Sequence, residues 1–178
     1  MTVSAARLTV DLVRAEEFAR VGDICVGAYA AAHLLAGPDE WYARHMRDVA
    51  ARAADAVVLV ARNGREAVGT VTLAAAGAAY ADIARGEELE VRMLAVDPAA
   101  QRRGVAEALL RGAEEWAREQ GYPVLVLSVF SKDGPGAPHR LYERLGYRRE
   151  RARDYVGEWD PDAIMWCYVR ELRALVAR

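Results

Sequence analysis

Residues 96–110 read VDPAAQRRGVAEALL. Before them, Leu89–Val96 alternates between apolar and charged residues and then becomes wholly apolar, which is typical of a strand entering the centre of a sheet. After Gly104, apolar residues recur at helical spacing, which predicts an amphipathic helix that ends at Gly121. Because the apolar run 123–129 follows immediately, we expect strand, helix and strand to form one right-handed crossover.

The rest of the chain predicts further elements around this crossover. Residues 74–84 are rich in alanine and glycine, which specify neither strand nor loop. Asp39 is expected to cap the second helix. The pattern predicts a single α/β domain over residues 1–178, with a mixed sheet and helices on both sides. We expect strands at 8–13, 56–61, 67–73, 147–150 and 164–169, and helices at 16–33, 39–54 and 137–145.

Composition and charge exclude several classes of protein. The 178 residues carry 24 basic and 26 acidic side chains, a net charge of −2, which disfavours nucleic-acid binding, including by paired N-terminal helices. Charged residues interrupt Met1–Phe18, so we expect no signal peptide or membrane span and a cytoplasmic protein. Cys25 and Cys167 stand far apart without histidines at ligand spacing, so we expect no metal site.

The turn before the amphipathic helix offers a place for an anion. The first turn of a helix exposes N–H groups without internal partners, and the helix dipole adds positive charge there. Gly104 and Ala106 allow phosphates to approach the main chain, while Arg102 and Arg103 can reach further phosphates. The alternative is that Gly104 only bends a loop and the arginines are solvated.

Two motifs here resemble one known family. Gln101, Gly104 and Ala106 match the Gln/Arg-x-x-Gly-x-Gly/Ala signature of the GNAT superfamily of acyl-CoA-dependent N-acetyltransferases. Residues 141–147, LYERLGY, resemble the later Leu-Tyr-x-x-x-Gly-Phe/Tyr motif of that family. The two motifs follow each other on the expected elements, whereas a dinucleotide fingerprint and a P-loop are both missing from the sequence.

The resemblance implies a fold and a cosubstrate. The fold would be a GNAT-like α/β (α+β) domain, with a mostly antiparallel sheet of six to seven strands, a splayed central pair and helices on both faces. Acetyl-CoA would bind as cosubstrate, with its pantetheine arm on the last residues of the central strand and its pyrophosphate on the following turn. The residues implied for the pantetheine arm are Leu94, Ala95 and Val96, those for the pyrophosphate are Arg102, Arg103, Gly104, Val105 and Ala106, and Gln101 lies at the entry.

The resemblance also implies two groups that handle protons, because an amine must lose one and the departing thiolate must gain one. Tyr142 matches the tyrosine that donates to the leaving sulfur, and its alternative role is aromatic packing on the sheet. Glu90, on the strand face opposite Leu89, Val91 and Met93, is the candidate base acting through water. An exposed carboxylate paired with Arg92 is its alternative. Other candidates for the base are water, Glu88, His33, His45 and His139.

The loop before residues 141–147 departs from the family pattern. Pro135 and Pro138 stand where the family often has an asparagine and a small residue. Since proline donates no backbone hydrogen bond, cofactor contacts from this loop are not carried over.

The resemblance implies an N-acetyltransferase that moves an acetyl group from acetyl-CoA to a primary amine by direct attack in a ternary complex. A non-catalytic acyl-CoA-binding module of the same fold is the alternative. The acceptor, a small-molecule or protein amine, would contact residues 29–42, 80–88 and 154–166, and monomer and homodimer both stay open. Acidic and aromatic residues there suit a cationic amine, or else form a solvated loop with tryptophans in the core: Trp41, Tyr42, Asp154, Glu158, Trp159, Asp160, Asp162 and Trp166.

Overall fold

The computed structural model describes residues 8–35, 40–131, 134–157, 162 and 164–172. The chain divides into two structural units. The first consists of Met1–Leu73 and Met93–Ala113, and the second consists of Ala74–Arg92 and Glu114–Arg178. The strand β4 (Glu88–Val96) and the helix α4 (Val105–Glu119) contribute residues to both units.

The first unit is built on an antiparallel sheet. β1 (Leu8–Leu12) pairs with β2 (Val57–Asn63), and β2 pairs with β3 (Glu66–Ala75) through a turn in which Gly64 has a φ of 64°. The predicted hairpin is therefore confirmed.

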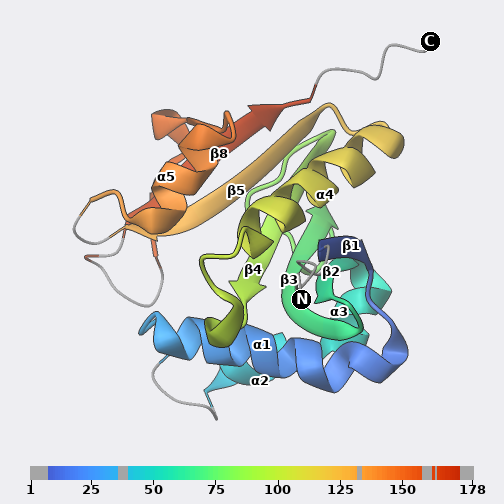
Figure 1. Cartoon of the computed structure of the whole chain (residues 1–178). Coiled ribbons are helices and arrows are strands. Elements are labelled where there is room, and N and C mark those ends of the chain that lie inside the picture. Colours follow the sequence, from blue (N-terminus) through green and yellow to red (C-terminus); the bar gives the residue numbers. More distant parts are fainter. Residues whose placement is uncertain (1–7, 36–39, 132–133, 158–161, 163, 173–178) are drawn as a thin grey trace, which may run out of the picture. The chain divides into compact units, whose positions relative to one another are not determined.

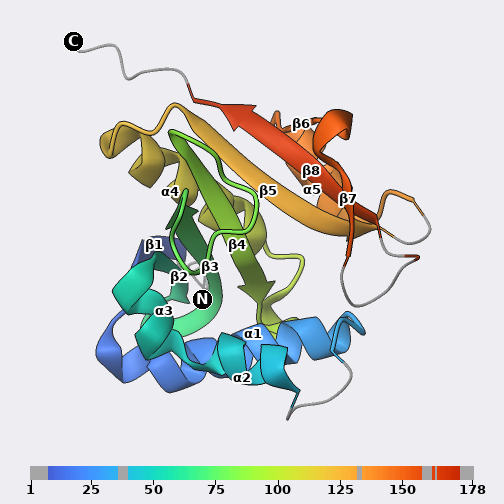
Figure 2. The same cartoon turned by 180° about the vertical axis from the view of Figure 1, so that it is seen from behind.

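Helices lie on both sides of the strands in the first unit. The start of α4 packs closely on β3, since a Cβ on Gly69 would lie 2.7 Å from Val105 Cγ1 and 3.0 Å from Leu109 Cδ1. In Figure 1 this part of α4 lies in front of the strands, and in Figure 2, seen from behind, α2 (Trp41–Arg47) and α3 (Val49–Asp55) lie in front of them. The predicted placement of helices on both sides is confirmed.

The segment predicted as one helix over 39–54 is two helices. The chain turns at Asp48, whose ψ is 69°, and the Asp48 carboxylate accepts a hydrogen bond from the Ala51 amide at 3.0 Å. This side chain caps α3, so a new helix begins here although apolar residues continue at helical spacing across the break. Asp39, the predicted cap, lies outside the described residues. The first predicted helix begins with a 3-10 turn, η1 (Ala15–Glu17), and continues as α1 (Phe18–Ala31).

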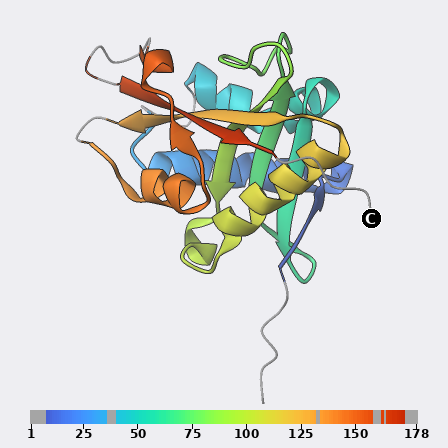
Figure 3. The ribbon, with the colours of Figure 1, turned by 90° about the horizontal axis from the view of Figure 1, so that it is seen from above.

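The second unit contains the strands that follow the crossover. The beginning of β4 pairs in parallel with β5 (Val124–Ser131), as expected for strands joined by a helix. β5 pairs antiparallel with β8 (Ile164–Glu171) along its whole length, and the short strands β6 (Arg148–Arg149) and β7 (Tyr155–Val156) pair with β8. The helix α5 (Ala137–Arg144) lies beside β8 in Figure 3 and contacts it through the rings of His139 and Trp166.

The strand order is β1-β2-β3-β4-β5-β8-β6, with β7 paired to β8. The sheet is mostly antiparallel and has eight strands, of which β6 and β7 have two residues each. Pairing of β4 with β5 covers only Glu88 to Glu90 against Val124 to Val126. Such short pairing agrees with the expected splayed central pair. Beyond it, Met93 has a φ of 48°, which interrupts the regular alternation of β4.

Candidate functional site

The turn between β4 and α4 is fixed at its first end by Asp97. Its carboxylate accepts a hydrogen bond from the Ala99 amide at 2.9 Å and pairs with Arg20, and these contacts lower the pKa of Asp97 against the opposing effect of burial. The Asp97 amide donates to the Val68 carbonyl of β3 at 2.9 Å, and the 3-10 turn η2 (Pro98–Ala100) follows. The chain therefore leaves β4 along a defined path.

The next residues have an unusual backbone. Gln101–Gly104 are all exposed, and Arg102 and Gly104 have φ values of 61° and 78°. Arg102 is not glycine, so this conformation costs energy that the surrounding structure must supply. A Cβ at Gly104 would meet no heavy atom within 4 Å, so Gly104 is needed for its φ and not to avoid a clash.

The amides of this turn have no acceptor within the described part of the chain. Among the described residues, no group accepts a hydrogen bond from the N–H groups of Arg102, Arg103, Gly104, Val105 and Ala106. The side chains of Arg102 and Arg103 form no ion pair with any described residue. Left-handed residues in a turn favour sets of N–H groups that bind anions, and Arg102 and Gly104 are both left-handed. The N-terminus of α4 adds its dipole. The arrangement is suited to a diphosphate.

The residues predicted to bind a pantetheine arm are the last three of β4. Ala95 is buried, with its carbonyl near Gly69 of β3, while Leu94 and Val96 are half-buried. They lie in the same unit as residues 101–106, to which β4 leads directly through η2. Their role and that of the turn remain predictions.

Tyr142 lies on α5 and is 7% exposed. Its ring packs against Tyr147 and Tyr168, with centroids 5.9 and 5.8 Å away. Burial raises the pKa of the phenol, so it carries its proton at neutral pH. Among the described residues its hydroxyl has no hydrogen-bond partner, in contrast to the Tyr168 hydroxyl, which donates to Glu143 at 3.1 Å. Tyr142 therefore has a proton to donate to a ligand.

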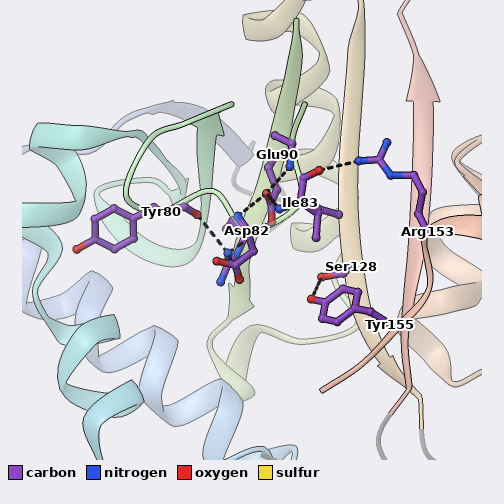
Figure 4. Close-up of polar contacts among 9 residues, drawn as sticks. Tyr80, Asp82, Ile83, Glu90, Ser128, Arg153 and Tyr155 are labelled. Atoms are coloured by element: carbon purple, nitrogen blue, oxygen red, sulfur yellow. Dashed lines mark hydrogen bonds and ion pairs between the residues drawn. The ribbon is translucent and has the colours of Figure 1, made fainter. Parts of the chain in front are cut away.

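Glu90 lies in the second unit and is fully buried. Its Oε2 accepts three hydrogen bonds from consecutive amides, those of Asp82, Ile83 and Ala84, at 2.8, 2.7 and 3.0 Å (Figure 4). Its Oε1 lies 3.4 Å from Arg92 Nη1. The alternative expected for Glu90, an exposed carboxylate paired with Arg92, is correct in the contact and wrong in the exposure, since the side chain is buried. These hydrogen bonds favour a different role for Glu90 than that of a base.

The other candidate bases have separate surroundings. Glu88 forms a double ion pair with Arg153, at 2.7 and 3.0 Å. His33 follows α1 and is exposed, and His45 of α2 stacks on Tyr42. His139 is buried, and burial lowers its pKa. Its Nδ1 accepts a hydrogen bond from the Gly136 amide at 2.9 Å, so the free proton of the neutral ring is on Nε2. None of them is marked out as a base by these contacts.

The residues expected near an acceptor divide into several groups. Trp41 of α2 is 67% exposed and contacts Tyr42 and His45. Asp154 accepts hydrogen bonds from Arg149 and the Cys167 amide, and Arg149 lies 3.3 Å above the Trp166 ring. Asp162 is exposed, and Glu158, Trp159 and Asp160 lie outside the described residues. Asp154 and Trp166 thus have structural partners.

Pro138 stands in the first turn of α5, where a missing N–H costs nothing. Pro135 precedes the helix, and the Pro135 carbonyl accepts a hydrogen bond from Arg140.

Sequence reasoning missed the contacts that fix residues 76–87. Arg153 donates to the Ile83 carbonyl at 2.7 Å, and Arg92 donates to the Tyr80 carbonyl at 3.2 Å and pairs with Asp82 (Figure 4). Ser128 of β5 and Tyr155 of β7 share a hydrogen bond of 3.1 Å. No local motif signals these pairs, because their members are mostly far apart in sequence.

The described residues form neither a metal centre nor a membrane-spanning helix. Across the described ranges, no cluster of histidine, cysteine or acidic side chains is arranged to hold a metal ion, and both cysteines are buried free thiols. No helix among those described has the length and apolarity to cross a membrane.

Comparison with known proteins identifies the family. The model of the acetyltransferase (GNAT) family matches residues 23–147, more than half of the chain. No curated protein sequence matches.

Solved structures share the fold at low identity. The ribosomal-protein-S18-alanine N-acetyltransferase of Escherichia coli is 17% identical, with a TM-score of 0.69 over 97% of each chain. The PaiA N-acetyltransferase of Thermoplasma acidophilum, solved with coenzyme A, is 14% identical, with a TM-score of 0.69 over 93% of this chain and 99% of that one. An N-acetyltransferase of Staphylococcus aureus Mu50 is 16% identical, with a TM-score of 0.67 over 94% of this chain and 99% of that one. By its family match, this chain belongs to the GNAT acetyltransferase family.

Proposed function

We propose that the chain transfers an acetyl group from acetyl-CoA to a primary amine, by direct attack of the amine in a ternary complex. The observation that carries the proposal is the set of backbone N–H groups at residues 102–106, which have no acceptor among the described residues. A structural neighbour solved with coenzyme A supports the choice of cosubstrate.

The residues of the turn would hold the diphosphate. The five amides would donate to its oxygens, Gln101 lies at the entry, and the guanidinium groups of Arg102 and Arg103 would neutralise its charge. Leu94, Ala95 and Val96 would bind the pantetheine arm through their backbone groups. Bound acetyl-CoA supplies the thioester whose carbonyl carbon the amine attacks.

Tyr142 is the proposed proton donor to the departing sulfur. Its raised pKa keeps the phenol protonated across the neutral range, and its hydroxyl has no partner among the described residues with which a ligand must compete. For removal of the amine proton the sequence predicts Glu90 acting through water. The contacts of Glu90 favour a positioning role instead.

The single domain predicted over residues 1–178 is kept in this proposal. The family match, residues 23–147, includes parts of both structural units. The proposed cofactor residues belong to the first unit, and Tyr142 belongs to the second.

A panel of amines tests the proposal by measuring the thiol released from acetyl-CoA. The panel should contain a polyamine, an aminoglycoside, free amino acids and a peptide with N-terminal alanine, the last because one structural neighbour acetylates the alanine of ribosomal protein S18. With at least one amine we expect acetyl-CoA to release one thiol for each molecule of acetylated amine formed. Thermal stabilisation by acetyl-CoA without thiol release from any amine would instead support the non-catalytic binding module.

Replacing Tyr142 by phenylalanine should lower kcat by about 10²-fold, the size expected for loss of one positioned acid, while the Kd for acetyl-CoA is unchanged. Tyr147→Phe is the matched control, because Tyr147 lies in the same aromatic cluster but its hydroxyl is buried and has no partner among the described residues. Equal turnover by the two variants would remove Tyr142 from the mechanism.

A further inference from the structure

Residues 76–87, which join β3 to β4, have few side chains that could hold them in place. Seven of the twelve residues from Ala76 to Glu87, AGAAYADIARGE, are alanine or glycine, and Tyr80 is the one residue of this loop that is buried. Apart from the burial of Tyr80, order in this loop depends on hydrogen bonds to its backbone.

Glu90 supplies the central hydrogen bonds. Its Oε2 accepts from three consecutive amides, at 2.8, 2.7 and 3.0 Å, which is the geometry by which a backbone turn binds an anion. Burial of a carboxylate is unfavourable unless it is compensated, and these three bonds together with Arg92 provide the compensation. The carboxylate of Glu90 thus acts as the anion of this loop.

Two arginines reinforce the same loop. Arg153 reaches from η3 (Arg151–Arg153) to the Ile83 carbonyl and to Glu88, which itself accepts from the Arg85 amide. Arg92 donates to the Tyr80 carbonyl at 3.2 Å. Figure 4 shows the contacts of Tyr80 and Ile83, and the bond from the Arg85 amide to Glu88 holds the loop beyond the three amides.

A base must take up a proton in each turnover and release it afterwards. Oε2 of Glu90 has its lone pairs directed at three N–H donors, Oε1 faces a guanidinium, and the side chain has no exposed surface. Protonation at Oε2 would break hydrogen bonds that hold the loop, and protonation at Oε1 would place the proton opposite the Arg92 guanidinium. This geometry assigns proton removal to another group.

We propose that Glu90 is a positioning residue, whose carboxylate fixes residues 80–87 as one wall of the acceptor site. The inference rests on the proposed acetyltransferase function for its kinetic part only. Its structural part, the anchoring of the loop by Glu90, stands on the hydrogen bonds alone.

The test compares Glu90→Gln and Glu90→Ala with a matched control, Glu114→Gln. Glu114 is also a buried glutamate of the second unit, paired with Arg118 and Arg170, but it does not contact the loop. For Glu90→Ala we expect the KM for the amine to rise at least about tenfold, while the KM for acetyl-CoA and the acid limb of the pH profile of kcat/KM stay unchanged. The glutamine variant keeps an acceptor oxygen, so it should recover most of this loss. The control should change neither KM.

Hydrogen exchange provides a readout that needs no turnover. The amides of residues 82–84 should exchange at least about tenfold faster in Glu90→Ala than in the wild type. Their exchange rates should be unchanged in Glu114→Gln. Unchanged exchange, or loss of the acid limb with equally low kcat in both Glu90 variants, would overturn the proposal. If the alanine variant does not fold, exchange and kinetics of the glutamine variant decide. Absence of thiol release by the wild type would refute the acetyltransferase proposal but leave the exchange result intact.

Discussion

Two loops of this protein present consecutive backbone N–H groups, and they differ in what accepts the hydrogen bonds. In the second unit the amides of residues 82–84 converge on the carboxylate of Glu90. In the first unit the amides of residues 102–106 have no acceptor among the described residues. The same backbone device is internally satisfied in one loop and available to a ligand in the other.

The difference follows from burial and from side chains. The loop at residues 82–84 lies against the buried residue Glu90, and an unpaired N–H beside a buried group would be unfavourable. The Glu90 carboxylate accepts hydrogen bonds from these amides and so removes this cost. The loop at residues 102–106 begins with exposed residues, and its side chains Arg102 and Arg103 are cations that attract an anion from solution. An anion-binding backbone is therefore evidence for a ligand only when no group of the protein fills it.

Replacing Gly104 by glutamate should have the largest effect, because it should prevent a ligand from reaching the amides of residues 102–106. A side chain at a φ of 78° strains the turn, and the new carboxylate repels the phosphates. We expect the stabilisation by acetyl-CoA, about 2.7 kcal/mol at 100 times the Kd, to fall to nearly zero. Differential scanning fluorimetry with and without acetyl-CoA measures it.

Gly121→Glu is the matched control for strain and charge. Gly121 has a φ of 83°, a Cβ there would also meet no heavy atom within 4 Å, and it follows the other end of α4. This variant should keep the full shift by acetyl-CoA. Loss of the shift in both variants would mean that strain in either turn, and not the amides, controls binding.

The two arginines sharpen the same point with a smaller effect. Arg102→Ala and Arg103→Ala should each weaken acetyl-CoA binding by about threefold to tenfold, because each removes one exposed cation from the phosphates. The loss should shrink as salt rises from about 0.05 to 0.3 M. Isothermal titration calorimetry checks it, with Arg111→Ala as control, since Arg111 is also exposed on α4 but pairs with Glu107. A loss independent of salt would contradict an electrostatic role.

Glu88 gives the smallest effect, on the pH dependence of stability. Burial would raise its pKa, but hydrogen bonds from Arg153 and the Arg85 amide outweigh it and lower the pKa below the ordinary 4.5. The Glu88 carboxylate therefore stabilises the fold above pH 4.5, and this stabilisation is lost as pH falls through its lower folded-state value. We expect the wild type to lose about 0.5 kcal/mol more than Glu88→Gln on acidification, measured by urea unfolding.

The control is Glu171→Gln, which removes the exposed partner of Arg148. Its stability should follow that of the wild type at every pH. Parallel loss in the wild type and Glu88→Gln would show that the loop gains nothing from this carboxylate.

Much of the fold was predictable because its signals are local. The alternation of Leu89–Val96, the apolar stripe after Gly104 and the apolar run 123–129 predicted the crossover, which the parallel pairing of β4 with β5 confirms. The break at Asp48 was not predicted. Apolar residues continue at helical spacing on both sides of it, and only the capping contact with Ala51 reveals where one helix ends and the next begins.

The candidate site divides in the same way. Gln101, Gly104 and Ala106 lie within one turn, so their spacing was visible in the sequence and indicated the family, which the family match confirms. The surroundings of Glu90 were not visible. Its position on a strand predicted a side chain facing away from Leu89 and Val91, but its burial depends on a loop of small residues whose path no periodicity specifies.

The amino-acid sequence by itself determined the crossover, the hairpin and the family, because these depend on residues a few positions apart along the chain. Only the tertiary structure decided that the amides of residues 102–106 lack an acceptor within the described part of the chain and that those of residues 82–84 have one. The physical reason is that a backbone N–H is the same group in every residue, so its partner is set by whichever acceptor the fold brings within hydrogen-bond distance.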